Sequence, residues 1–188
     1  MSLASLPNLL CVMRMLLAIP VVWALLEGYY GWTLGLFVAA AVSDGLDGFL
    51  AKQYDWTSEL GKVLDPVADK VLLVSVIITL TLVGMVPLWL TIVVVARDVV
   101  IGAGAGVYKW LFGPVEGQPT TASKVNTFFQ LTYVICVVAS AAAPIVPQAW
   151  VTLLGATVLV TTVVSGVDYT ATYVRKAVAV SQARRTAA

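Results

Sequence analysis

Hydrophobic residues occupy six long stretches of the chain, separated by short segments that contain glycine, proline or charged residues. Each stretch approaches the ~20 apolar residues that an α-helix needs to cross a bilayer. Six transmembrane helices are therefore predicted, at residues 9–26, 32–52, 61–83, 88–111, 123–143 and 150–173. Because 188 residues leave little room for a second domain, we expect one all-α polytopic membrane domain over residues 1–188.

Lysine and arginine are distributed unevenly between the connections of these helices. The first, third and fifth connections contain neither residue, whereas the second and fourth connections with their flanks contain Lys52, Lys62, Lys109 and Lys124. A basic tail follows the sixth predicted helix. Since basic residues mark the cytoplasmic ends of membrane helices, both termini are predicted to lie in the cytoplasm.

The overall composition narrows the chemistry. The chain is 60% hydrophobic and 11% charged with a formal net charge of +1, which gives no reason to expect a nucleic-acid partner. It contains no histidine, and this excludes a histidine nucleophile or base together with lipid transfer of the phospholipase D type. Any proton acceptor is therefore expected to be a carboxylate.

Four aspartates form two pairs at the adjoining ends of the second and third predicted helices: Asp44 with Asp47, and Asp65 with Asp69. Residues three or four positions apart share one face of a helix, so an antiparallel hairpin would bring the two pairs face to face. Four carboxylates so close together would repel one another unless a cation joined them. Oxygen ligands select hard cations such as Mg²⁺, Mn²⁺ or Ca²⁺. The sequence therefore predicts a divalent-metal site.

Other roles could account for some of these carboxylates. Asp65, followed by Pro66, suits the N-terminus of a helix, and Lys62 or Lys70 could pair with a neighbouring aspartate. A capping carboxylate has no need of three acidic partners, which favours the metal site. A divalent-cation transporter is the alternative from another functional class. Transporter sites usually lie near the bilayer midplane and between repeats, whereas these aspartates lie near helix ends.

The spacing of the aspartates resembles the signature of the CDP-alcohol phosphatidyltransferase family. The chain reads Asp44-x-x-Asp47-Gly48-x-x-Ala51-Lys52, then eight residues, then Gly61-x-x-x-Asp65-x-x-x-Asp69. One position departs from the family pattern, since Lys52 stands where the family usually has arginine. The resemblance implies an integral-membrane enzyme that transfers the phosphatidyl group of CDP-diacylglycerol to an alcohol acceptor and releases CMP.

The resemblance also implies roles for the residues of the signature. Two divalent ions, Mg²⁺ or Mn²⁺, would neutralise the pyrophosphate of the donor. Asp44, Asp47 and Asp65 are expected to bind metal, and Asp69 to bind it and to serve as the catalytic base toward the acceptor hydroxyl.

The donor CDP-diacylglycerol is expected to contact Gly48, Ala51, Lys52 and Gly61. The two glycines carry no side chain, so nucleotide can lie against the helices there, although close helix packing would explain them equally well. Lys52 could meet a phosphate, or it could be a lysine that reaches the membrane interface.

Pro7-Asn8 with Arg14 resembles an N-terminal element of the family, and residues 61–70 resemble the branch that makes phosphatidylglycerophosphate and cardiolipin. Two further elements look most like the cardiolipin synthases of the CDP-alcohol type. They are Arg97-Asp98, and Pro119-Thr120 followed by Ser123-Lys124-Val125-Asn126-Thr127 and Gln130.

The acceptor that this resemblance predicts is phosphatidylglycerol, with cardiolipin as the product. Relatives that make phosphatidylglycerophosphate commonly have two lysines at the start of the fifth helix, whereas here Lys124 stands alone with Asn126 in the second position. One cation, helped by Arg97, matches a singly charged phosphodiester better than the nearly doubly charged glycerol 3-phosphate. Arg14 is a further candidate for binding phosphate.

Three alternatives remain open at this point. Glycerol 3-phosphate could be the acceptor, which would make the chain a phosphatidylglycerophosphate synthase. Lys124 could merely mark the cytoplasmic end of its helix, with Arg97 paired inside the helix bundle. Arg14 could be an anchor at the membrane interface. The expected partners are membrane lipids and, by analogy with the family, a second copy of the chain. The expected location is a bacterial inner membrane, with the site facing the cytoplasm.

Overall fold

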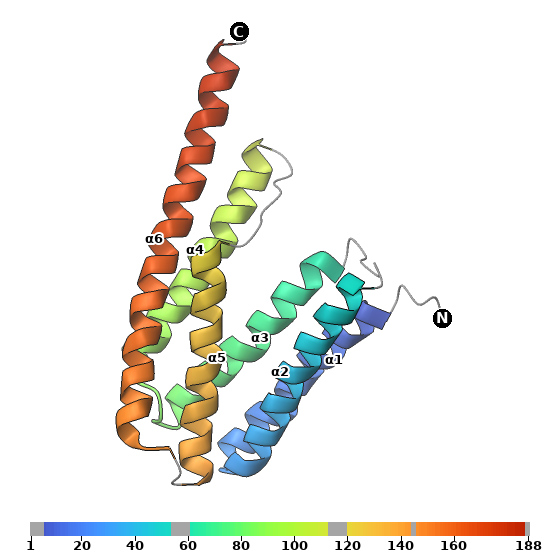
Figure 1. Ribbon diagram of the computed structural model, residues 1–188, viewed down its shortest axis with the longest axis vertical. Coiled ribbons are helices and arrows are strands. Elements are labelled where there is room, and N and C mark those ends of the chain that lie inside the picture. Colours follow the sequence, from blue (N-terminus) through green and yellow to red (C-terminus); the bar gives the residue numbers. More distant parts are fainter. Residues whose placement is uncertain (1–5, 54–60, 113–119, 144–145, 187–188) are drawn as a thin grey trace. The chain divides into compact units, whose positions relative to one another are not determined.

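The computed structural model describes residues 6–53, 61–112, 120–143 and 146–186, and describes side chains within 12–43, 68–107, 120–143 and 146–175. The described residues form six α-helices (Figure 1). Their bounds are α1 Leu6–Leu26, α2 Tyr30–Gln53, α3 Gly61–Leu82, α4 Leu88–Phe112, α5 Thr121–Ala142 and α6 Gln148–Thr186. The predicted all-α class is confirmed, and apart from the C-terminal end of α6 each helix end lies within three residues of its predicted position.

Helix α6 departs most from the prediction, because it continues to Thr186 through the basic segment that was expected to be a tail. The segment after Tyr173 contains neither glycine nor proline and is rich in alanine and arginine, with one lysine and one glutamine. These residues favour helix even where they are polar. The end of the apolar stretch was therefore the wrong place to end the helix.

Glycine ends two of the helices by the same mechanism. At the end of α1, Gly28 has φ 76°, and the amide of Tyr29 donates to the carbonyl of Ala24 at 2.8 Å. At the end of α3, Gly84 has φ 79°, and the amide of Met85 donates to the carbonyl of Leu80 at 2.8 Å. This is the Schellman arrangement, in which the left-handed residue is usually glycine. Both chain reversals therefore occur at predicted turns.

Helices α1, α2 and α3 belong to one compact unit, which also contains the end of α5 and the start of α6. Within it, α1 packs against both α2 and α3. The α1 residues Ala18, Val21 and Leu25 are buried, at a spacing that puts them on one face of the helix. Phe37 on α2 and Val76 on α3 are also buried. This packing brings the first helix against the helices that carry the two aspartate pairs.

Helix α4, the part of α5 up to Tyr133 and the part of α6 after Val151 form the second compact unit. Thr120 begins α5 with an N-cap, since its hydroxyl accepts a hydrogen bond from the amide of Ser123 at 3.2 Å. Further along, α5 packs closely on α6 at Gly155, where a Cβ atom would lie only 3.3 Å from the ring of Tyr133. Glycine at this position lets the tyrosine ring pack against the backbone of α6.

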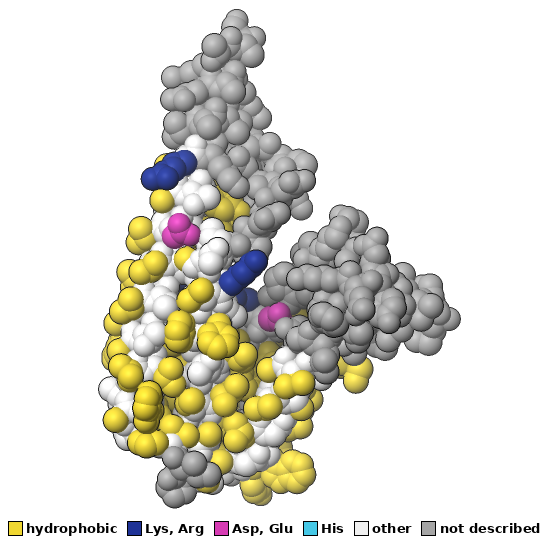
Figure 2. Space-filling model, viewed as in Figure 1, with side chains coloured by type: hydrophobic (Ala, Val, Ile, Leu, Met, Phe, Trp, Pro, Cys, Tyr) yellow, Lys and Arg dark blue, Asp and Glu magenta, His cyan; other side chains and the backbone are white. Residues whose placement is uncertain are grey.

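The described surface is strongly apolar. Figure 2 shows hydrophobic side chains spread over the described part of one face, with few charged ones among them. Exposed large hydrophobic residues include Leu16, Ile19 and Trp23 on α1 and Val160 and Val167 on α6. Among the residues whose side chains are described, three helical segments are long and apolar enough to cross a membrane: Leu88–Val107, Thr121–Ala142 and Gln148–Arg175. Exposed apolar surface of this extent is a feature of membrane proteins.

Candidate functional site

The two aspartate pairs lie on helices that follow one another in the sequence, as predicted. Asp44 and Asp47 belong to α2, and Asp65 and Asp69 belong to the first turns of α3. Of the four side chains, only that of Asp69 is among the described ones. The side chains at the predicted donor-binding positions also fall outside the described ones; these positions are Gly48, Ala51, Lys52 and Gly61.

Asp69 forms an ion pair and hydrogen bond with the guanidinium of Arg14, which donates through Nη1. Arg14 comes from α1 and is 7% exposed, whereas the side chain of Asp69 is 40% exposed. A buried guanidinium is costly unless an anion lies beside it, so the pairing explains how α1 accommodates an arginine in its interior face. A buried and paired Arg14 differs from an interfacial anchor, whose charged end would lie in water.

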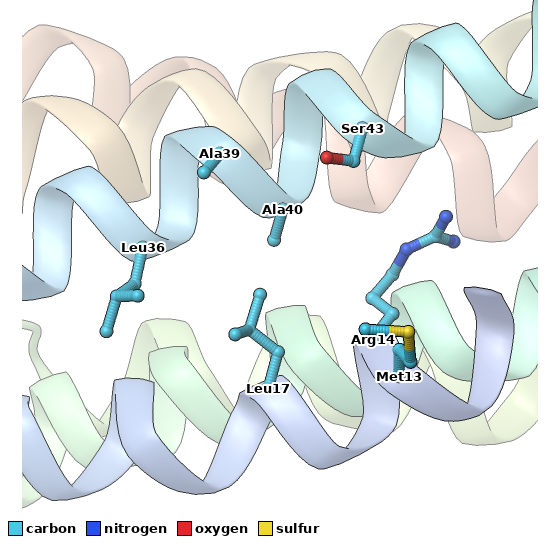
Figure 3. Close-up of a pocket in the computed structure, with 7 residues that line it drawn as sticks. All are labelled: Met13, Arg14, Leu17, Leu36, Ala39, Ala40 and Ser43. Carbon is cyan, nitrogen blue, oxygen red and sulfur yellow. The ribbon is translucent and has the colours of Figure 1, made fainter. Parts of the chain in front are cut away.

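A cavity of about 190 Å³ lies beside Arg14, between α1 and α2 (Figure 3). Most of its lining is apolar, and its polar groups are Arg14 and Ser43, the residue before Asp44. The residues that line it are Met13, Arg14, Leu17, Leu36, Ala39, Ala40 and Ser43. The cavity thus joins an apolar space between two helices to the helix segment that carries the first aspartate pair.

Sequence reasoning did not single out this cavity. The sequence feature that could have indicated it is a group of small residues on α2, which leaves room opposite the larger Leu17 of α1. These small residues are Ala39, Ala40 and Ser43. Small residues on a helix face more often permit close packing than open a cavity. The pattern alone was therefore ambiguous.

Arg97 is the centre of a hydrogen-bond network in the second compact unit. It is 7% exposed, and its Nη1 donates to Asp98 Oδ1 at 2.6 Å. Its Nη2 donates to the hydroxyl of Ser123 at 2.8 Å and to that of Ser165. A Cβ at Gly166 would lie 3.7 Å from Arg97 Cγ, so the methylene stem of the arginine lies against α6. Arg97 therefore links α4 to α5 and α6.

Lys124 follows Ser123 in the first turn of α5, and its side chain is exposed. Arg97 thus contacts Ser123, the residue that precedes Lys124. Of the two predicted cations, Arg97 is buried and Lys124 is exposed. This arrangement agrees with the alternative in which Arg97 pairs inside the bundle. It leaves Lys124 as the accessible cation of the two.

The described side chains include no group of three or more acidic, histidine or cysteine residues that could hold a metal ion. Three of the four predicted ligands, Asp44, Asp47 and Asp65, lie outside that set. The predicted donor set nevertheless fits a hard divalent cation in its chemistry, since it consists of carboxylates on two adjacent helices. Asp69 is the member of this set whose surroundings the structure describes.

Comparison of the sequence with known proteins identifies a family. Residues 4–182 match the family model described as CDP-alcohol phosphatidyltransferase. A cardiolipin synthase (CMP-forming) of Rattus norvegicus is 37% identical over an alignment of 157 residues that covers 75% of this chain and 51% of the relative. A cardiolipin synthase (CMP-forming) of Streptomyces coelicolor is 35% identical over 112 residues, covering 56% of this chain and 52% of the relative.

A probable phosphatidylglycerophosphate synthase of Mycobacterium tuberculosis is 31% identical over 187 residues, covering 92% of this chain and 83% of the relative. The chain thus spans about half the length of the cardiolipin synthases named above and most of the length of the mycobacterial protein. The family model covers nearly the whole sequence, including both aspartate pairs and the paired Arg14. The chain belongs to the CDP-alcohol phosphatidyltransferase family.

Proposed function

We propose that this chain transfers the phosphatidyl group of CDP-diacylglycerol to phosphatidylglycerol, giving cardiolipin and CMP. The observation that carries the proposal is the pairing of Arg14 with Asp69, the last aspartate of the signature. The pair links α1 to α3, which bears the second pair of aspartates, and gives Asp69 a charged neighbour. The cardiolipin synthases of rat and of Streptomyces, similar to this chain at 37% and 35% identity, support the choice of product.

Asp44, Asp47, Asp65 and Asp69 would hold two divalent cations, Mg²⁺ or Mn²⁺. When bound, such ions neutralise the charge of the pyrophosphate as CMP leaves. Gly48, Ala51, Lys52 and Gly61 would contact the donor on the same two helices. Lysine supplies a point charge to phosphate and lacks the bidentate fork of arginine, so we expect Lys52 to make a single contact.

Asp69 is the proposed base. A carboxylate can take the proton of an alcohol as the new bond to phosphorus forms, provided that it lies within hydrogen-bond reach of the hydroxyl. Arg14 would hold the Asp69 carboxylate in one orientation through its hydrogen bond to Oδ1. The 40% exposure of the Asp69 side chain leaves it accessible to a substrate.

Lys124 is the cation that would meet the phosphodiester of the acceptor, because its side chain is exposed at the start of α5. Arg97 would add positive charge from its buried position in the hydrogen-bond network. The contacts of Arg97 with Asp98, Ser123 and Ser165 support this division between an exposed and a buried cation.

We further propose that the whole chain forms one membrane domain of six spans, with both termini and the aspartates on the cytoplasmic side of a bacterial inner membrane. The three long apolar segments and the apolar surface support the membrane location. The distribution of lysine and arginine supports the orientation. A homodimer is proposed by analogy with the family.

The acceptor is tested by supplying purified protein with labelled CDP-diacylglycerol and one acceptor at a time. Cardiolipin should form with phosphatidylglycerol, and little product should form with glycerol 3-phosphate. Phosphatidylglycerophosphate as the sole product would instead make the chain a phosphatidylglycerophosphate synthase. The mycobacterial relative, matched over 83% of its length, is the observation that favours this second candidate. Transport of labelled Mn²⁺ into proteoliposomes without lipid product would support the transporter alternative.

A further inference from the structure

Helix α5 carries a line of polar residues on its buried face. Ser123, Asn126 and Gln130 follow at spacings of three and four residues, so they share one side of the helix. Asn126 and Gln130 are both 0% exposed. Amide side chains inside an apolar bundle are costly unless their donors and acceptors are matched. Each of these buried amides therefore requires both a hydrogen-bond donor and an acceptor beside it.

Asn126 is matched at its oxygen. Its Oδ1 accepts hydrogen bonds from the hydroxyls of Thr161 and Thr162, each at 2.9 Å. These contacts fix the amide against α6 and turn Nδ2 away from the two threonines. Among the described residues, none accepts a hydrogen bond from the buried Nδ2.

Gln130 is unmatched at both ends of its amide. Neither Nε2 nor Oε1 has a hydrogen-bond partner among the described residues, and both atoms are buried. Arg97 Nε, in the same group of helices, is a further buried donor in the same condition. Each unmatched buried group destabilises the folded protein, because it gives up its hydrogen bonds to water without replacement. Native proteins rarely retain several such groups without a bound water or ligand.

The unmatched atoms of Asn126 and Gln130 define a consistent chemistry. Residues four apart on a helix have Cβ atoms about 5–6 Å from each other, and a single oxygen can bridge two groups at ~2.9 Å from each. The two amides offer two nitrogen donors and one oxygen acceptor. A hydroxyl both accepts and donates hydrogen bonds, so it complements this set, whereas a metal cation or an apolar group does not.

We infer that Asn126 and Gln130 form a binding site for a hydroxyl oxygen inside the group formed by α4, α5 and α6. The hydroxyl comes either from water or from an alcohol acceptor, and the second source rests on the function proposed above. The site would explain why two amides occupy the interior of a helix whose other buried residues, such as Tyr133, are largely apolar.

Radiolytic labelling in H₂¹⁸O tests the site without depending on activity. Hydroxyl radicals formed from an internal water label the side chains next to it, even where bulk solvent has no access. Tyr133 is the reporter, because it is 4% exposed and lies one turn after Gln130 on the same face. The full chain in nanodiscs should therefore take up ¹⁸O at Tyr133.

Gln130→Met keeps the length of the side chain and removes the amide, so labelling of Tyr133 should fall several-fold. Val94→Ile is the matched control, since Val94 is an apolar residue of α4 that is 1% exposed; labelling should stay at the wild-type level. Asn126→Leu removes the other half of the site and serves where Gln130→Met does not yield folded protein. An unlabelled Tyr133 in the wild type, or equal labelling in Gln130→Met, would overturn the inference.

The same samples distinguish the two sources of the hydroxyl. If the acceptor supplies it, adding phosphatidylglycerol should protect Tyr133 from labelling, and Gln130→Met should raise the KM for the acceptor several-fold while kcat changes little. If water supplies it, labelling of Tyr133 should not change when phosphatidylglycerol is added, and Gln130→Met should not change the KM for the acceptor. Should the wild type make no lipid product at all, the labelling of Tyr133 and its loss in Gln130→Met still report on the site.

Discussion

Arg14 on α1 donates a hydrogen bond to Asp69 on α3, across a separation of 55 residues in the sequence. The last aspartate of the family signature is therefore held by a residue outside the signature. Arg14 also borders the cavity between α1 and α2 that reaches Ser43, next to the first aspartate of the signature. The first helix thus contributes to the site as well as to the packing.

Asp69→Asn should abolish turnover while CDP-diacylglycerol binding survives, because the amide cannot accept the proton of the acceptor hydroxyl. Excess chelator should also abolish turnover, since the other carboxylates of the signature are expected to need a divalent cation. The measurement is transfer of label from CDP-diacylglycerol to lipid product, together with donor binding. Asp168→Asn is the control, because Asp168 is an exposed carboxylate on α6, and it should keep wild-type activity. Full activity of Asp69→Asn would exclude Asp69 as the base.

Arg14→Met and Asp69→Asn should be coupled energetically, because each change removes one half of an ion pair. Each single change removes this ion pair, so the two single changes together should cost more stability than the double change. We expect a coupling energy of about 1–3 kcal/mol, toward the lower value because Asp69 is 40% exposed. Unfolding of the four proteins in detergent measures it. Additive effects would mean that the pair contributes nothing to stability.

The apolar pattern predicted the described helices well, because each is a long apolar stretch that ends near glycine, proline or charged residues. It also predicted the turns at Gly28 and Gly84, since a residue with positive φ is usually glycine. It failed at the end of α6, where helix formation depends on local propensity and not on hydrophobicity. Arg175, for example, lies well within α6 although it is charged.

The candidate site was predictable only where spacing along one helix carries the information. The aspartate pairs repeat at three and four residues, so their helices could be inferred from the sequence. The pairing of Arg14 with Asp69 depends instead on how α1 packs against α3, which no local pattern encodes. The same holds for Asn126, whose threonine partners come from α6.

Lys52 should behave as a point charge toward phosphate. Lys52→Arg should then retain activity, and Lys52→Met should lose about 1.5–3 kcal/mol of transition-state stabilisation, the value of a hydrogen bond to a charged group. Comparing kcat/KM for the donor in the two variants measures this loss. Equal activity of Lys52→Met and the wild type would identify Lys52 as a lysine that only reaches the membrane interface.

Gly84→Ala should destabilise the fold even though a Cβ at this position would meet no described atom within 4 Å. The cost is conformational, since an L-residue with φ near 79° is strained by about 1–2 kcal/mol. Gly35→Ala is the matched control, because Gly35 lies within α2 and its Cβ would also meet no described atom within 4 Å. That change should raise the thermal midpoint, since alanine favours helix by about 0.5–1 kcal/mol over glycine. A higher midpoint for Gly84→Ala than for Gly35→Ala would contradict this account of the turn.

Lys124→Gln should raise the KM for phosphatidylglycerol and leave the KM for CDP-diacylglycerol unchanged, because Lys124 is the exposed cation proposed to meet the acceptor. An exposed ion pair contributes up to about 1 kcal/mol, which corresponds to roughly a fivefold change in KM. Since salt screens exposed charges, the difference from the wild type should shrink as ionic strength rises. Lys124→Arg should restore the wild-type KM, and Arg175→Gln, which removes an exposed cation of α6, should have no effect. An unchanged acceptor KM in Lys124→Gln would mean that Lys124 only marks the cytoplasmic end of its helix. Arg97 would then be the remaining candidate for the contact with the phosphodiester.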